Sequence, residues 1–126
     1  MEITNTSNYR DNNSNYNWSD FLQLYNQFSA DRNLLQQDLS QTPPNWSKIQ
    51  QDLSKMEQDF KAMVQMAPFM KGASAKLLSG VLEPMANFIA QMKDEVTDKN
   101  TDAVSQTLVL FNLQMGPILQ VILQGR

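Results

Sequence analysis

The side chains that remain for any chemistry in this sequence are carboxylates, lysines, tyrosines and hydroxyls, because its 126 residues include no histidine and no cysteine. Histidine is the commonest general base near neutral pH, and both missing residues are common transition-metal ligands. Disulfides and thiolate nucleophiles are excluded as well. We therefore expect no enzymatic activity, no metal site and no bound cofactor.

The carboxylates are scattered over polar helix faces and turns. The main ones are Asp52, Glu57, Asp59, Asp94, Glu95, Asp98 and Asp102. A dinuclear metal site in a helical bundle uses inward glutamates with a Glu-x-x-His motif, which a chain without histidine cannot form. The acidic turn at residues 94–102 lacks the glycine and the final glutamate of a calcium-binding loop. We interpret these carboxylates as a solvated surface.

The segment Lys71–Lys76 brings two cations and Ser74 to the start of a predicted helix, an arrangement that can hold an anion. It lacks the glycine-rich sequence of a phosphate-binding loop. The interpretation that fits better is an ordinary capped turn.

The elements that would position these residues are four helices, predicted near residues 19–39, 45–67, 74–96 and 102–124 from apolar side chains spaced alternately by three and four. No alternation of period two, typical of strands, occurs. Pro68 should stop or bend the second helix near Ala67, and Pro84 should bend the third over Gly80. The sequence thus predicts an all-α fold, namely an antiparallel four-helix bundle with kinked third and fourth helices.

Each predicted helix carries one apolar stripe that should face the core. The stripes are Trp18, Phe21, Tyr25, Phe28, Leu35 and Leu39 in the first helix; Trp46, Ile49, Leu53, Met56, Phe60, Met63, Ala67 and Met70 in the second; Leu78, Leu82, Met85, Ile89, Met92 and Val96 in the third; and Val104, Leu108, Phe111, Met115, Ile118 and Ile122 in the fourth.

The domain organisation follows from composition. Residues 1–17 are rich in asparagine and serine and predict a flexible polar tail, whereas residues 18–126 predict a single helical domain. The net charge of −3 and the lack of a basic stripe argue against a nucleic-acid partner. The amino-terminal residues lack a secretory signal pattern, so we expect a soluble, cytoplasmic protein. The alternative is export without a cleaved signal by a specialised secretion system.

The fourth predicted helix has more apolar surface than one packed stripe requires. No ionisable side chain occurs between Ala103 and Gly125, and six large apolar residues lie off its main stripe, namely Val109, Leu110, Leu113, Leu119, Val121 and Leu123. Methionines are also concentrated in the second and third helices, and such adaptable side chains suit varied partners. The candidate partner-binding residues are Val109, Leu110, Leu113, Val121, Leu123, Met66 and Met70.

Two functions fit this pattern. The first is a non-enzymatic interaction or assembly module, in which the apolar fourth helix and Met-rich helix faces bind another protein chain or a second copy. The alternative is a carrier of a small apolar ligand or lipid in a cavity between proline-bent helices. A membrane-spanning fourth helix is disfavoured, because its glutamines and the Gly116-Pro117 pair would be costly in lipid.

Overall fold

The computed structural model describes residues 16–125, and within this range the chain forms helices and no strand. The long elements are α1 (Trp18–Leu39), α2 (Trp46–Met66), α3 (Leu78–Thr97) and α4 (Thr101–Gly125). Two short 3-10 helices, η3 (Ala67–Phe69) and η4 (Ala73–Leu77), join α2 to α3. The prediction of an all-α fold with four long helices is confirmed.

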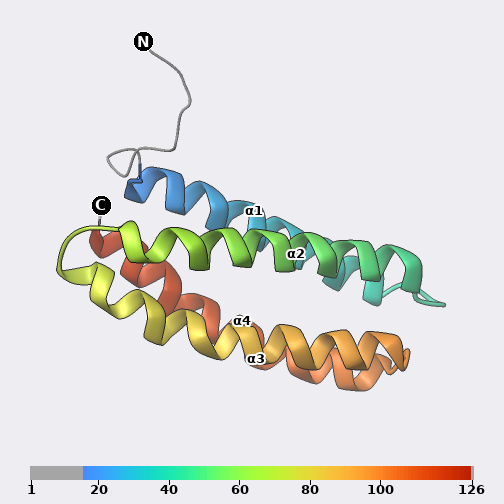
Figure 1. The fold of residues 1–126 in the computed structure, drawn as a ribbon. Coiled ribbons are helices and arrows are strands. Elements are labelled where there is room, and N and C mark those ends of the chain that lie inside the picture. Colours follow the sequence, from blue (N-terminus) through green and yellow to red (C-terminus); the bar gives the residue numbers. More distant parts are fainter. Residues whose placement is uncertain (1–15, 126) are drawn as a thin grey trace, which may run out of the picture.

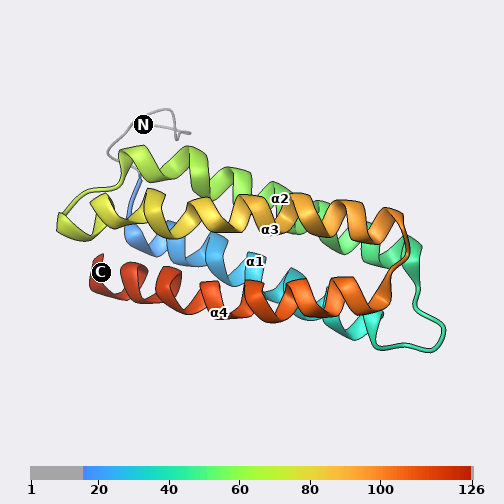
Figure 2. The same ribbon diagram turned by 90° about the horizontal axis from the view of Figure 1, so that it is seen from below.

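The four helices lie side by side in a bundle (Figure 1). α1 packs most extensively on α2, and α3 packs on α4, while contacts between α1 and α4 and between α2 and α3 join the two pairs. The α1–α2 and α3–α4 connections lie at one end of the bundle (Figure 2). The α2–α3 connection lies at the other end, together with the start of α1 and the end of α4.

Three of the helices begin at an asparagine, whose side-chain oxygen replaces a missing partner of the first turn. Asn17, Asn45 and Asn100 each accept a hydrogen bond from the backbone amide three residues later, at 2.9, 3.1 and 3.1 Å. Asn17 therefore caps α1, Asn45 caps α2 and Asn100 caps α4.

The predicted flexible tail falls mostly on residues 1–15, which lie outside the described residues. Its last two residues, Tyr16 and Asn17, contact the bundle. The Tyr16 ring stacks on Phe69 with ring centroids 4.9 Å apart, and Asn17 caps α1. The Nε1–H group of the neighbouring Trp18 donates to the Lys71 carbonyl at 3.0 Å.

The prolines act differently in the three helices that contain or precede them. α2 ends at Met66, just before Pro68, as predicted. α3 and α4 continue through Pro84 and Pro117. α3 begins at Leu78, four residues after the predicted start, because Gly72 turns the chain at a φ of 98° and residues 73–77 form the tighter η4 helix.

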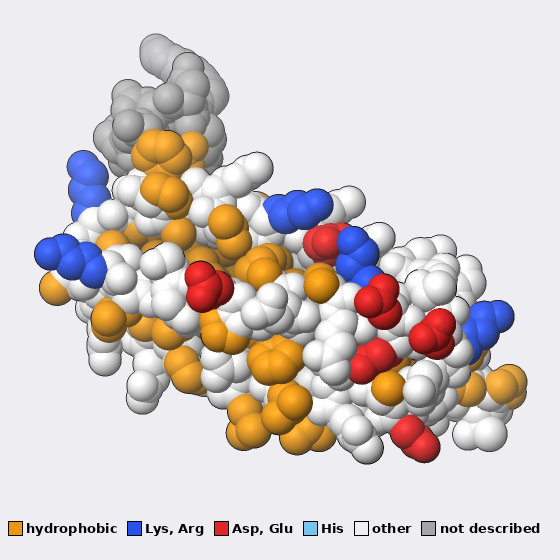
Figure 3. All heavy atoms as spheres, turned by 60° about the horizontal axis from the view of Figure 1, so that its bottom comes forward, with side chains coloured by type: hydrophobic (Ala, Val, Ile, Leu, Met, Phe, Trp, Pro, Cys, Tyr) orange, Lys and Arg blue, Asp and Glu red, His pale blue; other side chains and the backbone are white. Residues whose placement is uncertain are grey.

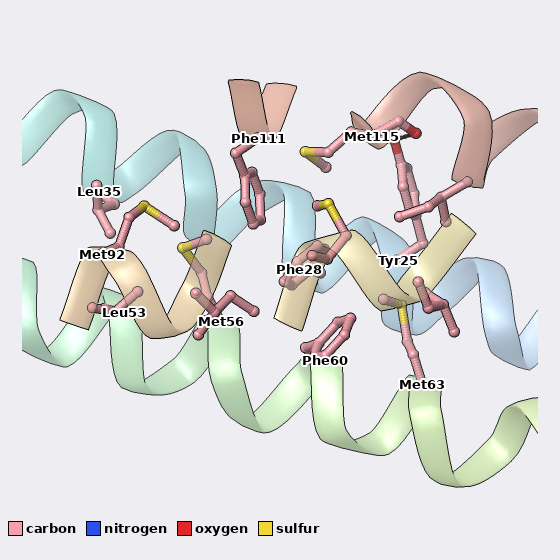
Figure 4. Close-up of a cluster of buried hydrophobic side chains, with 14 of the residues drawn as sticks. Tyr25, Phe28, Leu35, Leu53, Met56, Phe60, Met63, Met92, Phe111 and Met115 are labelled. Carbon is pink, nitrogen blue, oxygen red and sulfur yellow. Dashed lines mark hydrogen bonds between the residues drawn. The ribbon is translucent and has the colours of Figure 1, made fainter. Parts of the chain in front are cut away.

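The four predicted stripes meet in the core of the bundle, where nearly all their members are buried (Figure 4). Trp18, Trp46 and Ala67 are half-buried exceptions. The prediction that methionines form binding faces on the second and third helices is wrong for the monomer. All seven described methionines are in the core: Met56, Met63, Met66, Met70, Met85, Met92 and Met115.

Phe28 occupies the middle of this core. Its ring centroid lies 6.0 Å from that of Phe60 on α2 and 5.4 Å from that of Phe111 on α4. One turn earlier on α1, the Tyr25 hydroxyl donates to the Met115 carbonyl of α4 at 3.3 Å. These contacts attach α1 to both of its neighbours.

We predict that Phe28→Ala lowers the free energy of unfolding by about 3–5 kcal/mol, because it leaves a cavity between three helices. Gln27→Ala, at an exposed position of the same helix, should change the free energy by no more than about 0.5 kcal/mol. Urea unfolding followed by circular dichroism measures both. Losses of equal size in the two variants would contradict the placement of Phe28.

Candidate functional site

The largest group of exposed apolar side chains lies on the side of α4 that faces away from the other helices. Among the described residues, eight large hydrophobic side chains are exposed, and four of them are on α4. We call this surface the outer face of α4. It comprises Val109, Leu110, Leu113, Gly116, Pro117, Gln120 and Leu123.

The structure brings four of the seven predicted partner-binding residues onto the outer face. Val109, Leu110, Leu113 and Leu123 are 59%, 48%, 69% and 52% exposed. The other three, Val121, Met66 and Met70, are buried in the core and do not contribute to this surface. Val121 is covered because η4 packs against α4 beside it.

The outer face of α4 carries no charge along its length, since no ionisable residue occurs between Ala103 and Gly125. Its midpoint is Gly116, where an added Cβ atom would meet no other atom within 4 Å. Val109 precedes this glycine by seven residues and Leu123 follows it by seven, so both lie on the same side of the helix. The face therefore has two apolar ends and a low centre.

No family model, curated protein or solved structure matches the chain.

By length and mean hydropathy, α4 also meets the criteria for a membrane span, with a third of the tested window buried inside the bundle. Core helices of water-soluble proteins meet the same criteria. Here the buried stripe of α4 supplies Phe111 and Met115 to the core. Packing in the core explains why the buried side of α4 is apolar, but it does not explain why the outer face is apolar.

A second surface feature is an apolar groove between the carboxyl-terminal half of α2 and the amino-terminal half of α3. Its volume is about 760 Å³. Phe60, Leu78 and Leu82 form its apolar base, and the small side chains of Ala67, Ala75 and Ala86 line it as well. Lys61, Lys76 and Glu83 also line the groove. In Figure 3, hydrophobic side chains spread over the left and centre of this side of the molecule, whereas acidic side chains gather toward the right.

Sequence reasoning missed this groove as a specific site, although it anticipated an apolar cavity between helices. The signal that could have found it was the series of alanines and serines near the ends of the second and third helices, because short side chains on facing helices leave space. Helix periodicity alone does not state which faces meet.

The interpretation of Asp52 and Asp59 as solvated is wrong. Asp52 is fully buried, and Asp59 is half-buried. Burial and the neighbouring Asp38 carboxyl group raise the pKa of Asp52 to about 6, although Lys48 opposes the shift. Burial and the Asp31 carboxyl group raise the pKa of Asp59 to about 7.

Metal-ligating groups do not gather anywhere in residues 16–125, where no three histidine, cysteine, aspartate or glutamate side chains lie together. The turn at Lys71–Lys76, which we considered as an anion site, contacts the start of α1. Its Lys71 carbonyl accepts the hydrogen bond from Trp18, so the segment anchors the start of α1. The outer face of α4 and the α2–α3 groove are therefore the candidate sites.

We predict that Val109→Gln and Leu113→Gln each change the free energy of unfolding by no more than about 0.5 kcal/mol in dilute solution, because both side chains are exposed. Val121→Gln should cost about 1–3 kcal/mol, since it places an amide in the core. Thermal or urea unfolding at low protein concentration makes the comparison. A large loss for Leu113→Gln would show that the residue belongs to the core.

Proposed function

We propose that the chain is a non-enzymatic assembly module that pairs with a second copy of itself through the outer face of α4. The observation that carries this proposal is the row of four large apolar side chains held on a charge-free helix face. Contiguous exposed apolar surface is typical of interaction sites. Full burial of an exposed side chain of this size contributes about 1.5–3 kcal/mol, and a partner would supply roughly half of that for each of these partly exposed side chains.

The arrangement of the outer face favours a second copy over an unrelated partner. In a two-fold pair, the same patch meets itself, and when the axis is perpendicular to α4 the two α4 helices run in opposite directions. With the axis at Gly116, Val109 of each copy faces Leu123 of the other. The missing side chain at Gly116 lets the helices approach closely where they cross. No charge on the face opposes this contact.

This proposal includes a finer description of the fold. We propose an antiparallel bundle whose third and fourth helices bend at Pro84 and Pro117. The positions of the connections at alternate ends support the antiparallel order. The bends are supported by the amides that the two prolines lack, which leave carbonyls one turn earlier without their usual helical partner. A bend at Pro117 would lie beside the proposed axis.

The test compares two added lysines. Gly116→Lys places a bulky charge at the axis, twice in each pair, and should weaken self-association by at least about tenfold, because like charges would meet there. Ala90→Lys adds the same side chain at an exposed position of α3 and should leave association unchanged. Sedimentation equilibrium measures the association constant, and circular dichroism checks that both variants stay helical.

Two results would contradict self-association through α4. One is a wild-type chain that remains monomeric at millimolar concentration. The other is an equal response of association to Gly116→Lys and Ala90→Lys, which would place the contact elsewhere. Binding of the monomer to neutral lipid vesicles, abolished by Leu113→Asp, would instead assign the outer face to a membrane.

The α2–α3 groove favours a second candidate function, the carriage of a small apolar ligand. Its volume falls in the range of about 300–1,000 Å³ typical of ligand sites. Two lysines and one glutamate among the lining residues favour an apolar molecule with one anionic group. A single-chain fatty acid has that chemistry.

We predict that dodecanoate binds this groove and that Ala86→Phe, which fills it, weakens binding at least about tenfold by excluding the alkyl chain. Ala90→Phe is the matched control, one turn further along α3 and outside the groove. Isothermal titration calorimetry gives both affinities. No heat of binding to the wild type, or equal loss in the two variants, would remove the carrier function and leave the assembly function untouched.

A further inference from the structure

Two pairs of aspartates lie across the interface between α1 and α2. Lys48 of α2 contacts both Asp38 of α1 and Asp52 of α2, which places these two carboxyl groups beside each other. Asp31 of α1 in turn acts on Asp59 of α2 and raises its pKa. The two pairs are separated by seven residues along each helix, so the second pair repeats the first about two helical turns away. Paired aspartates therefore occur at two separate places along the α1–α2 interface.

Three of the carboxyl oxygens in these pairs have no hydrogen-bond donor among residues 16–125. The Oδ2 atoms of Asp38, Asp52 and Asp59 are buried, and no other group within the described chain forms a hydrogen bond with them. An ionised carboxylate only accepts hydrogen bonds, so two facing carboxylates cannot bond to each other. A proton on either member of a pair turns that carboxyl group into a donor, which can then form a hydrogen bond with the other carboxylate.

We propose that the α1–α2 interface is a proton-dependent latch, in which each aspartate pair holds one proton while the helices are packed and releases it when they separate. The proposal is independent of self-association and of ligand carriage. It makes the stability of the fold depend on pH in a range where a chain of this composition would otherwise show little dependence.

The charged groups around the two pairs differ, and this difference makes one pair bind its proton more tightly than the other. The Nζ atom of Lys48 lies 3.2 Å from Asp52 Oδ1 and 3.8 Å from Asp38 Oδ2, and it partly neutralises that pair. Asp31 is the charged residue that acts on Asp59, and no lysine offsets the rise in the pKa of Asp59. The pKa of Asp59 is accordingly raised further than that of Asp52, to about 7 and about 6 respectively.

Other charges near the interface have partners elsewhere. Arg32 of α1 donates from Nη1 to Gln36 Oε1 of the same helix at 3.2 Å. On the α3 side, Lys93 pairs with Glu57 of α2 at 3.1 Å. α4 has no ionisable residue between Ala103 and Gly125. The protonation of each aspartate pair is therefore governed by charged residues of α1 and α2.

The direction of the pH effect follows from the raised pKa values. In the unfolded chain an aspartate has a pKa of about 3.9. Between that value and the folded-state pKa, the folded chain binds more protons, so its stability falls as pH rises. The contribution of the latch is complete below about pH 4 and is lost as pH passes through about 6 and then about 7.

The experiment is urea unfolding of the full chain at pH 5.0 and pH 7.5, followed by circular dichroism. We expect the unfolding equilibrium constant to be at least about tenfold larger at pH 7.5, given the linkage between protonation and folding. The chain has no histidine, so no side chain with an ordinary pKa titrates in this window. An unfolding constant that is the same at both pH values would overturn the proposal.

The matched variants are the double substitution Asp52→Asn with Asp59→Asn, and Asp94→Asn at an exposed site of α3. An asparagine amide donates a hydrogen bond without a proton to lose, so the double variant should vary less than about threefold between the two pH values. Asp94→Asn should keep the wild-type dependence. If the double variant also keeps it, the latch is wrong.

A direct readout covers the case in which the double variant does not fold. In wild-type protein, the side-chain carbon signals of Asp52 and Asp59 report their ionisation by nuclear magnetic resonance. We expect one midpoint near pH 6 and one near pH 7. Midpoints near pH 4 for both Asp52 and Asp59, about the value of an unperturbed aspartate, would overturn the proposal, whatever the variants do.

Discussion

The contact of Phe28 with Phe60 and Phe111 is the interaction on which the rest of the bundle depends. It joins α1 to α2 and to α4 at mid-length, and Met56, Met63 and Met115 fill the space around these rings (Figure 4). Flexible thioether side chains adapt to the irregular gaps that bulky rings leave. The methionines that the sequence suggested for a partner are therefore used inside the molecule. The surface that remains for a partner is aliphatic and belongs mainly to α4.

The α2–α3 contact is less extensive than the α1–α2 and α3–α4 contacts. α3 is secured mainly by α4, and α2 mainly by α1. Short side chains at Ala67, Ala75 and Ala86 then leave a groove between the two helix pairs. α4 has the opposite character. It combines a core stripe with an apolar outer face, and its lack of charge serves both surfaces at once.

Periodicity within single helices was enough to predict the helices and most of the core. All six stripe residues of α3, from Leu78 to Val96, are buried, because a three-four spacing keeps them on one side of a helix whatever its neighbours are. The same reasoning placed Leu113 outside. It failed for Val121, which η4 covers, since η4 depends on the turn at Gly72. It also failed for Asp52 and Asp59, whose burial depends on the register between α1 and α2, and a single-helix pattern contains no information about register.

The attachment of Trp18 has a practical consequence for observing this molecule. Its ring occupies the place that a Cβ atom at residue 125 would need, so only glycine fits at the end of α4, and its indole also bonds to Lys71. Trp46 begins α2 at the opposite end of the bundle. The two tryptophans are the only ones in the chain. Their intrinsic fluorescence, separated by replacing one or the other with phenylalanine, therefore reports independently on fraying at the two ends of the bundle.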